Sequence, residues 1–212
     1  MVNSGLKSVD RKQKILTTAL ILMNEQGVES VSMDEIARKA GISKGALYLE
    51  FESKTDLIIT LSSGFSEQLN RQFSQALASP RTGLEILKDY GAIYLRFVHQ
   101  NPLFMATLTA YQRALMDGKL ENLHSAKICK ELERDAMTLV VRAAQIGIQD
   151  GSIVSKVDPS TLGLLIFAGF KGLTDLYHVT SVIPGQERVE DLKTFEEVMS
   201  IFMEIMERGI SA

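Results

Sequence analysis

Apolar residues recur at helical spacing along most of this chain, and no segment alternates apolar and polar positions as a half-buried strand does. The first amphipathic segment covers residues 10–26, and Gly27 ends it. Two short helices are predicted next, one after Ser32 and one after Ser43. The pattern therefore predicts an all-α protein that begins with a three-helix unit.

Serine residues stand before three successive helix starts. Ser32, Ser43 and Ser53 each carry the hydroxyl that an N-cap uses. Glu35 follows Ser32 by three positions and completes the sequence of a capping box. Gly41 stands where the first short helix must stop, a place that commonly needs a left-handed backbone. These signals predict two short helices joined by a tight turn, with another helix directly after them.

Longer helices are predicted for the rest of the chain, because Pro and Gly residues punctuate long amphipathic segments. The expected segments are 54 to about 77, 83–99, 103 to about 116, a long charged helix ending near 150, one from 158 to before 184, and a last one over about 190–208. We predict two domains, 1–56 and 57–212.

A short helical hairpin of this kind is how a helix-turn-helix presents its second helix to the major groove, although any well-capped hairpin shares the local signals. More specific residues stand in fixed register around it: Ile15, Leu16, Ala19, Gly27, Ile36, Ala37, Ala40, Gly41, Ile42, Ser43, Lys44, Gly45, Leu47, Tyr48, Phe51, Ser53, Lys54 and Leu57. With these residues, the segment 10–57 resembles the DNA-binding domain of the tetracycline-repressor (TetR) family of transcriptional regulators. The resemblance implies a helix-turn-helix domain followed by a larger helical domain for ligand binding and dimerisation.

The resemblance also assigns candidate DNA contacts. The second helix of the motif reaches base edges with its N-terminal end in this class, and that end holds Lys44. The candidate DNA-binding residues are Thr17, Ser32, Ser43, Lys44, Gly45, Ala46, Tyr48 and Lys54. Two alternatives stay open: the serines only cap helices, and Tyr48 is a packed aromatic.

Position 50 departs from the family pattern. The residue before Phe51 is often a His or Tyr that contacts phosphate in relatives, whereas here it is Glu50. A carboxylate beside a phosphate is repelled unless it points away or accepts a hydrogen bond from cytosine N4. Residues 1–56 also hold eight Lys/Arg and eight Asp/Glu, so a basic footprint is missing. Both features favour the alternative of a helical small-molecule-binding or adaptor protein without DNA binding.

Two apolar faces in the last helices are candidates for self-association. In relatives these helices form a four-helix dimer interface, and a dimer suits a palindromic operator. The candidate interface residues are Leu162, Leu165, Ile166, Gly169, Phe170, Leu173, Phe202 and Ile205. The alternative is an ordinary core within one chain.

An effector pocket is expected among the middle helices, where aromatic and Met residues give an adaptable apolar lining with a few hydroxyl groups. Its candidate residues are Tyr90, Tyr94, Phe97, Phe104, Met105, Leu108, Tyr111 and Met116. Such a lining suits a lipophilic or aromatic small molecule. The alternative is again plain core.

Composition adds a few limits. The apolar content of 45% over 212 residues is enough for a small domain and a larger one. The single cysteine, Cys129, excludes an internal disulfide and fits a reducing compartment. No charged leader with an apolar run opens the chain, and the longest apolar stretch, 162–170, is too short for a membrane span. We expect a soluble, cytoplasmic protein.

Sequence patterns for catalysis are absent. There is no G-x-S-x-G, H-E-x-x-H or G-x-x-x-x-G-K-[ST], and the three His are too scattered for a metal site. We expect neither an enzyme nor a cofactor. The resemblance implies a regulator, with repression as the expected sign, whose dimer leaves its operator when an effector favours a second conformation.

Overall fold

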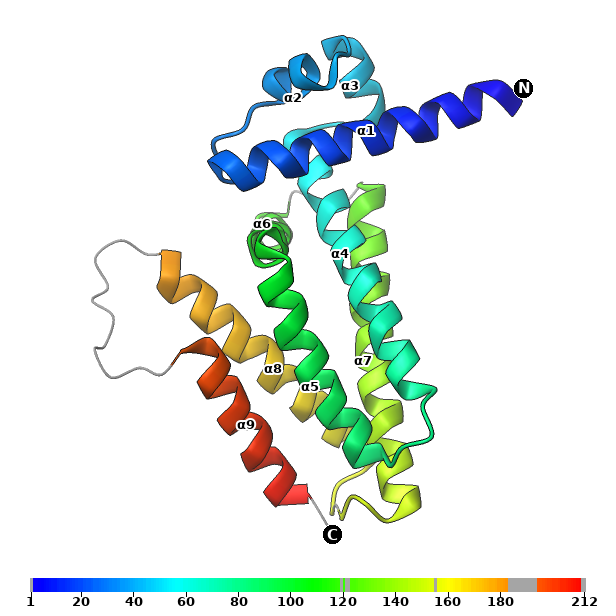
Figure 1. Ribbon diagram of the computed structural model, residues 1–212, viewed down its shortest axis with the longest axis vertical. Helices are drawn as coiled ribbons and strands as arrows, with labels where there is room; N and C mark the ends of the chain where they lie inside the picture. The colour runs from blue at the N-terminus through cyan, green and yellow to red at the C-terminus, as the bar shows by residue number, and fades with distance from the viewer. Residues whose placement is uncertain (1, 119, 121–122, 155, 183–193, 211–212) are drawn as a thin grey trace. The chain divides into compact units, whose positions relative to one another are not determined.

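The computed structural model describes residues 2–118, 120, 123–154, 156–182 and 194–210. Within these residues the chain forms nine helices and no strand, which confirms the predicted all-α fold (Figure 1). The helices are α1 Val2–Gln26, α2 Met33–Ala40, α3 Lys44–Glu50, α4 Lys54–Leu77, α5 Gly83–Gln100, α6 Pro102–Met116, α7 His124–Asp150, α8 Pro159–Val182 and α9 Phe195–Ile210. None of them is long and apolar enough to cross a bilayer.

Most helix ends lie where Ser, Pro and Gly residues predicted them. One difference is α1, which starts at Val2 and not at position 10. The expected start of the last helix near 190 lies outside the described residues.

The helices divide into two compact units. Unit 1 comprises residues 1–65 and 101–130, and unit 2 comprises residues 66–100 and 131–212. Unit 1 therefore extends beyond the expected N-terminal domain 1–56, because it also takes in α6 and the first turns of α7. The division falls inside α4 and α7, so each of these helices contributes to both units.

Unit 1 is built around the helix-turn-helix. Its main core joins α1, α2 and α3 through residues that are almost fully buried, among them Ile15, Ile36 and Leu47. Leu103 and Ala106 of α6 pack against the same core, which is the physical reason why α6 belongs to this unit. Figure 1 shows α2 and α3 lying next to each other beside α1.

Unit 2 packs α5, α8 and α9 side by side, together with parts of α4 and α7 (Figure 1). Small residues allow close approach in this unit. A Cβ on Gly163 of α8 would lie 2.6 Å from Cγ2 of Val141 in α7. A Cβ on Gly169 would lie 2.3 Å from the ring of Phe202 in α9. The glycines of α8 therefore set how closely its neighbours in this unit can pack.

Candidate nucleic-acid interface

The two helices of the motif are fixed by their ends. The Ser32 hydroxyl accepts a hydrogen bond from the Glu35 N–H at 3.2 Å, and the Ser43 hydroxyl accepts one from the Ala46 N–H at 3.1 Å. Gly41 ends α2 with φ 64° and ψ 38°, a left-handed conformation that favours glycine. The expected capping box is only half present, because the Glu35 carboxylate accepts a hydrogen bond from the Gln26 amide at 3.0 Å instead.

Helix α3 buries one side and exposes the other. Leu47 has no exposed surface, whereas Tyr48 is 44% and Leu49 is 81% exposed. A Cβ on Gly45 would meet no atom within 4 Å, so no described part of the chain covers the start of α3 at this position. The exposure of Tyr48 argues against its being a packed aromatic.

Two lysines flank this exposed surface and already have partners. Nζ of Lys44 lies 2.8 Å from the Asp34 carboxylate, which raises the pKa of Lys44 mainly through their hydrogen bond. Both side chains are exposed, and an ion pair of this kind stabilises weakly, so a phosphate can replace Asp34 at little cost. Nζ of Lys54 donates to the backbone carbonyl of Glu29 at 2.7 Å and has two further protons to offer. Thr17 is exposed on α1.

Glu50 points away from the exposed face of α3. Nε of Arg11, in α1, donates to its carboxylate at 2.7 Å, and a guanidinium NH2 group contacts the same oxygen. The Glu50 side chain is only 10% exposed. Next to it, Nζ of Lys12 lies 5.4 Å from the centre of the Phe51 ring, a cation–π contact. The departure from the family pattern at position 50 therefore serves packing between α1 and the end of α3.

Several carboxylates in this region are engaged within the protein. Besides Glu50, the side chain of Asp34 holds Lys44, and that of Glu35 holds Gln26. The ion pairs engage Arg11 and Lys44 along with Glu50 and Asp34, so they hold these carboxylates in place without changing the formally neutral balance of residues 1–56.

Asp56 is a functional candidate that the sequence did not single out. One carboxylate oxygen accepts a hydrogen bond from the Ser125 hydroxyl at 2.6 Å, and the other accepts one from the Glu52 N–H at 3.0 Å. Its own N–H donates to the Ser53 hydroxyl at 3.1 Å. Asp56 therefore joins the loop before α4 to the first turn of α7. The sequence showed Asp56 only as an acidic residue in the first turn of a helix.

The expected effector residues lie in both units. Tyr90, Tyr94 and Phe97 belong to α5 in unit 2, and the rest belong to α6 in unit 1: Phe104, Met105, Leu108, Tyr111 and Met116.

Within unit 2, Tyr90 stacks on Phe73 with ring centres 4.5 Å apart. Its hydroxyl is buried and has no hydrogen-bond partner among the residues that the structure describes. Tyr94 donates to the Thr174 hydroxyl at 3.0 Å, and burial raises the pKa of Tyr94 above its ordinary value. Phe97 is buried as well.

Within unit 1, Phe104 makes an edge contact with Phe65 at 6.1 Å, and Met105 is also buried. Tyr111 is buried in a small core with Cys129, and Leu108 packs against that core. Met116, by contrast, is 82% exposed, because it lies on the solvent side of the last turn of α6.

The expected dimer residues divide into two groups. Leu162 and Ile166 are buried within the chain, and Phe170 and Phe202 pack against each other at 5.4 Å. Gly169 lies under Phe202, and Leu173 is half-buried. Leu165 and Ile205 are 56% and 63% exposed. Leu164 and Leu176, also exposed on α8, extend this second group.

No group of three His, Cys, Asp or Glu side chains suited to a metal ion occurs among the described residues. The one cysteine, Cys129, is buried.

Comparisons with known proteins agree with this architecture. The family model described as "Bacterial regulatory proteins, tetR family" matches residues 15–61. The chain is 48% identical over 48 residues to the HTH-type transcriptional regulator AcrR of Shigella flexneri, a match that covers 23% of this chain and 22% of that protein. It is 31% identical over 137 residues to the nucleoid occlusion factor SlmA of Glaesserella parasuis, covering 63% of this chain and 67% of that protein.

A solved structure extends the likeness to nearly the whole chain. The transcriptional regulator FadR of Bacillus subtilis, solved with stearoyl-CoA, superposes with a TM-score of 0.66 at 18% sequence identity, covering 93% of this chain and 98% of that one. Sequence matches to the first curated relatives span only 22% to 58% of their length. The matched helix-turn-helix, the shared fold and the SlmA match lead to one conclusion: this chain belongs to the TetR family of bacterial regulatory proteins.

Proposed function

We propose that this protein is a DNA-binding transcriptional regulator that works in the cytoplasm and responds to a small-molecule effector. The exposed face of α3 carries the proposal, since it leaves Lys44 and Tyr48 exposed while Leu47 anchors the helix in the core. In a helix-turn-helix, this is the face that enters the major groove.

The candidate contacts take different roles in this proposal. Gly45 and Ala46 let the backbone of α3 approach the bases, and Ala46 is placed to touch a thymine methyl group. Lys44 leaves Asp34 for a guanine or a phosphate. Tyr48, Lys54 and Thr17 contact the phosphate backbone, and the hydroxyl groups of Ser32 and Ser43 donate to phosphate while still capping their helices.

We further propose a homodimer that binds a palindromic operator. Leu165 and Ile205, with their exposed neighbours Leu164 and Leu176, would form its interface on α8 and α9. Exposed apolar patches that are larger than single side chains mark interaction sites on soluble proteins. A two-fold dimer matches the symmetry of a palindrome.

The effector is proposed to be a lipophilic or aromatic small molecule. Tyr90, Tyr94 and Phe97 of α5 support this class, because all three supply apolar rings and the two tyrosines add hydroxyl groups. The buried Tyr90 hydroxyl, which no described residue hydrogen-bonds, is the polar group that such a ligand would satisfy. The FadR structure was solved with stearoyl-CoA, a ligand whose stearoyl chain is apolar, so this fold accommodates a ligand with a long apolar chain in that protein. We propose that effector binding releases the DNA and that the protein acts as a repressor.

A selection from genomic fragments tests the proposal. Purified protein should enrich a palindromic site, and affinity for that site should fall steeply as salt rises, because phosphate contacts release counterions. A Tyr48→Ala, Lys54→Ala double variant should lose the site. No enrichment over random DNA at low salt would contradict a regulator and favour a helical ligand-binding or adaptor protein without DNA binding.

A second candidate role is that of a nucleoid occlusion factor. In this role the protein binds DNA but does not regulate transcription. The match to a nucleoid occlusion factor, at 31% identity over 137 residues, is the observation that favours it. A reporter gene downstream of the selected site decides between the two roles. Expression that changes with the protein supports the regulator, and occupancy without any change supports the second role.

A further inference from the structure

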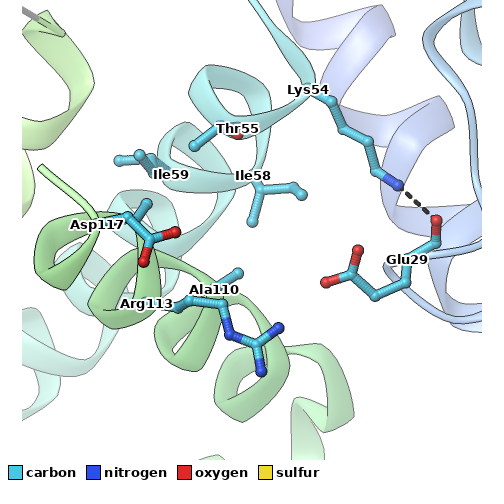
Figure 2. Close-up of a pocket in the computed structure, with 9 residues that line it drawn as sticks. Glu29, Lys54, Thr55, Ile58, Ile59, Ala110, Arg113 and Asp117 are labelled. Atoms are coloured by element: carbon cyan, nitrogen blue, oxygen red, sulfur yellow. Dashed lines mark hydrogen bonds between the residues drawn. The ribbon is translucent and has the colours of Figure 1, made fainter. Parts of the chain in front are cut away.

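Unit 1 contains a pocket of about 150 Å³ beside the DNA-reading helices. Three pieces of chain form its walls: the turn after α1, the first turns of α4 and the end of α6 (Figure 2). Its lining residues are Glu29, Lys54, Thr55, Ile58, Ile59, Ala110, Arg113, Ala114 and Asp117. A cavity of this volume is large enough to bind a benzene-sized molecule.

Opposite charges face the pocket from two walls. Figure 2 shows the Glu29 carboxylate turned towards it from the turn after α1, and the Arg113 guanidinium extending from α6. Among the described residues, neither of these charged groups makes a hydrogen bond or an ion pair, and they do not pair with each other. Each group is therefore available to a ligand.

The rest of the lining is mixed, because Lys54 and Asp117 add one charge of each sign, Thr55 adds a hydroxyl group, and the other four residues are apolar. Ile58, Ile59 and Ala114 are at most 6% exposed and give the pocket a buried floor. A ligand that fits must combine a short apolar body with a negative and a positive group. We propose that this pocket binds a small aliphatic zwitterion with the chemistry of a free amino acid.

The two charged groups suit the two ends of such a ligand. A guanidinium binds a carboxylate with two parallel N–H···O bonds, so Arg113 takes the carboxylate of the ligand. The Glu29 carboxylate accepts from its ammonium group. The aliphatic side chain covers Ile58 and Ala114.

Lys54 connects the pocket with DNA binding. It lines the pocket while Nζ donates to the Glu29 carbonyl at 2.7 Å (Figure 2). The ligand carboxylate also accepts a hydrogen bond from Nζ of Lys54, which is then less available to a phosphate. This consequence rests on the proposed function, whereas ligand binding itself does not. By linkage, DNA and ligand then weaken each other's binding by the same factor.

Calorimetry with valine and two compounds that each lack one of its charges tests the site. Isobutylamine lacks the carboxylate of valine, and isovalerate lacks its ammonium group. Valine should bind once per chain, and each of the other two should bind about tenfold or more weakly, since each loses a charge-assisted hydrogen bond. No binding of valine or of any other aliphatic amino acid at millimolar concentration would overturn the proposal.

Charge-removing variants locate the ligand. Arg113→Gln should lower the affinity for valine about tenfold and leave the affinity for isobutylamine unchanged. Glu29→Gln should also lower the affinity for valine about tenfold, but it should leave the affinity for isovalerate unchanged. Arg134→Gln, at an exposed position of α7, serves as the control and should bind valine normally.

Two results would contradict the site. One is unchanged valine affinity in both variants. The other is that both variants are less stable than the wild type in the absence of ligand. That result would mean that Glu29 and Arg113 pair with each other in solution and are not available to a ligand.

A final titration of the selected operator with and without valine measures the coupling. If the calorimetric result holds while no operator can be found, the ligand site stands and the proposed function fails. If valine binds but leaves operator affinity unchanged, the role given to Lys54 is wrong.

Discussion

Glu50 occupies the last position of the recognition helix, and its carboxylate binds Arg11 of α1. A negative side chain here would repel a phosphate if it faced the duplex. Its place between α1 and α3 makes it a structural residue instead. In the sequence, Glu50 was evidence against DNA binding. In the structure, its side chain holds α3 in position against α1.

Replacing Glu50 tests this role. Glu50→Gln should lower the free energy of unfolding by about 1 kcal/mol, because the pair with Arg11 is partly buried and loses its charge. Urea unfolding monitored by circular dichroism measures the change. Glu52→Gln, two positions away and exposed, should change stability by less than about 0.5 kcal/mol. Equal stability of the Glu50 variant and the wild type would show that the ion pair adds nothing.

Glu133 in α7 gives the protein a pH-dependent stability. Burial raises the pKa of its carboxyl group above the ordinary 4.5, Lys171 partly offsets this, and Asp175 adds to the rise. The folded chain therefore binds this proton more tightly than the unfolded chain does. The ionised group costs stability at pH values above the raised pKa, and the cost disappears below the ordinary value.

It follows that Glu133→Gln should be more stable than the wild type at neutral pH. The difference should shrink towards zero as the pH falls to about 4, where both states carry a protonated carboxyl group. Thermal unfolding of both proteins between about pH 4 and 8 measures this difference in stability. Glu131→Gln, at an exposed position of the same helix, is the control. A difference that does not vary with pH would mean that the ionised form of Glu133 costs nothing.

At the scale of elements, the N-terminal turns of α4 and α7 are tied together within unit 1. The Ser125 hydroxyl donates to Asp56, and Cys129 contacts the Ile59 carbonyl one turn further along at 3.5 Å. Asp56 also holds the N–H of Glu52, in the loop that follows α3. The position of the loop that follows α3 thus depends on α7 as well as on α4.

Ser125→Ala should lower the free energy of unfolding by about 1–3 kcal/mol, since it removes a partly buried hydrogen bond to a carboxylate. Thr138→Ala is a matched change in the same helix, because its exposed hydroxyl donates only to the Arg134 carbonyl of α7. Chemical unfolding of both variants gives the comparison. Equal losses would refute a special role for the bond between Ser125 and Asp56.

The sequence carried most of the information on where elements begin and end. Local signals such as Ser43 before α3 and Gly41 after α2 act through their own backbone neighbours, so they can be read without a structure. Contacts between distant positions have no such signal. Arg11 and Glu50 are 39 positions apart, and Asp56 and Ser125 are 69 apart.

Faces of helices were harder to assign than their ends. The apolar stripe of α8 looked uniform in sequence, yet Leu162 is buried within the chain while Leu165 is exposed. The two positions differ in what packs on them, and that depends on how the helices of unit 2 are arranged. For the same reason, the contribution of α6 to unit 1 could not be predicted from its own residues.

At the scale of the whole molecule, the proposed operator symmetry requires a dimer. Leu165→Glu and Ile205→Glu should each shift the protein to monomers at micromolar concentration, because an unpaired charge buried in an interface costs several kcal/mol. Sedimentation velocity measures the oligomeric state. Leu115→Glu, at an exposed position of α6, should leave the dimer intact. A Leu165→Glu protein that remains dimeric would place the interface elsewhere.

The central claim is that the exposed face of α3 reads DNA, and the salt dependence of operator binding tests it most directly. Affinity for the selected duplex should be measured at several salt concentrations for the wild type, for Lys44→Gln and for Arg134→Gln. We predict that Lys44→Gln weakens binding and reduces the slope of log affinity against log salt by about 1, as the loss of one phosphate contact requires, whereas Arg134→Gln changes neither quantity. If Lys44→Gln binds the operator with wild-type affinity and slope, this face of α3 does not contact the duplex and the account is wrong.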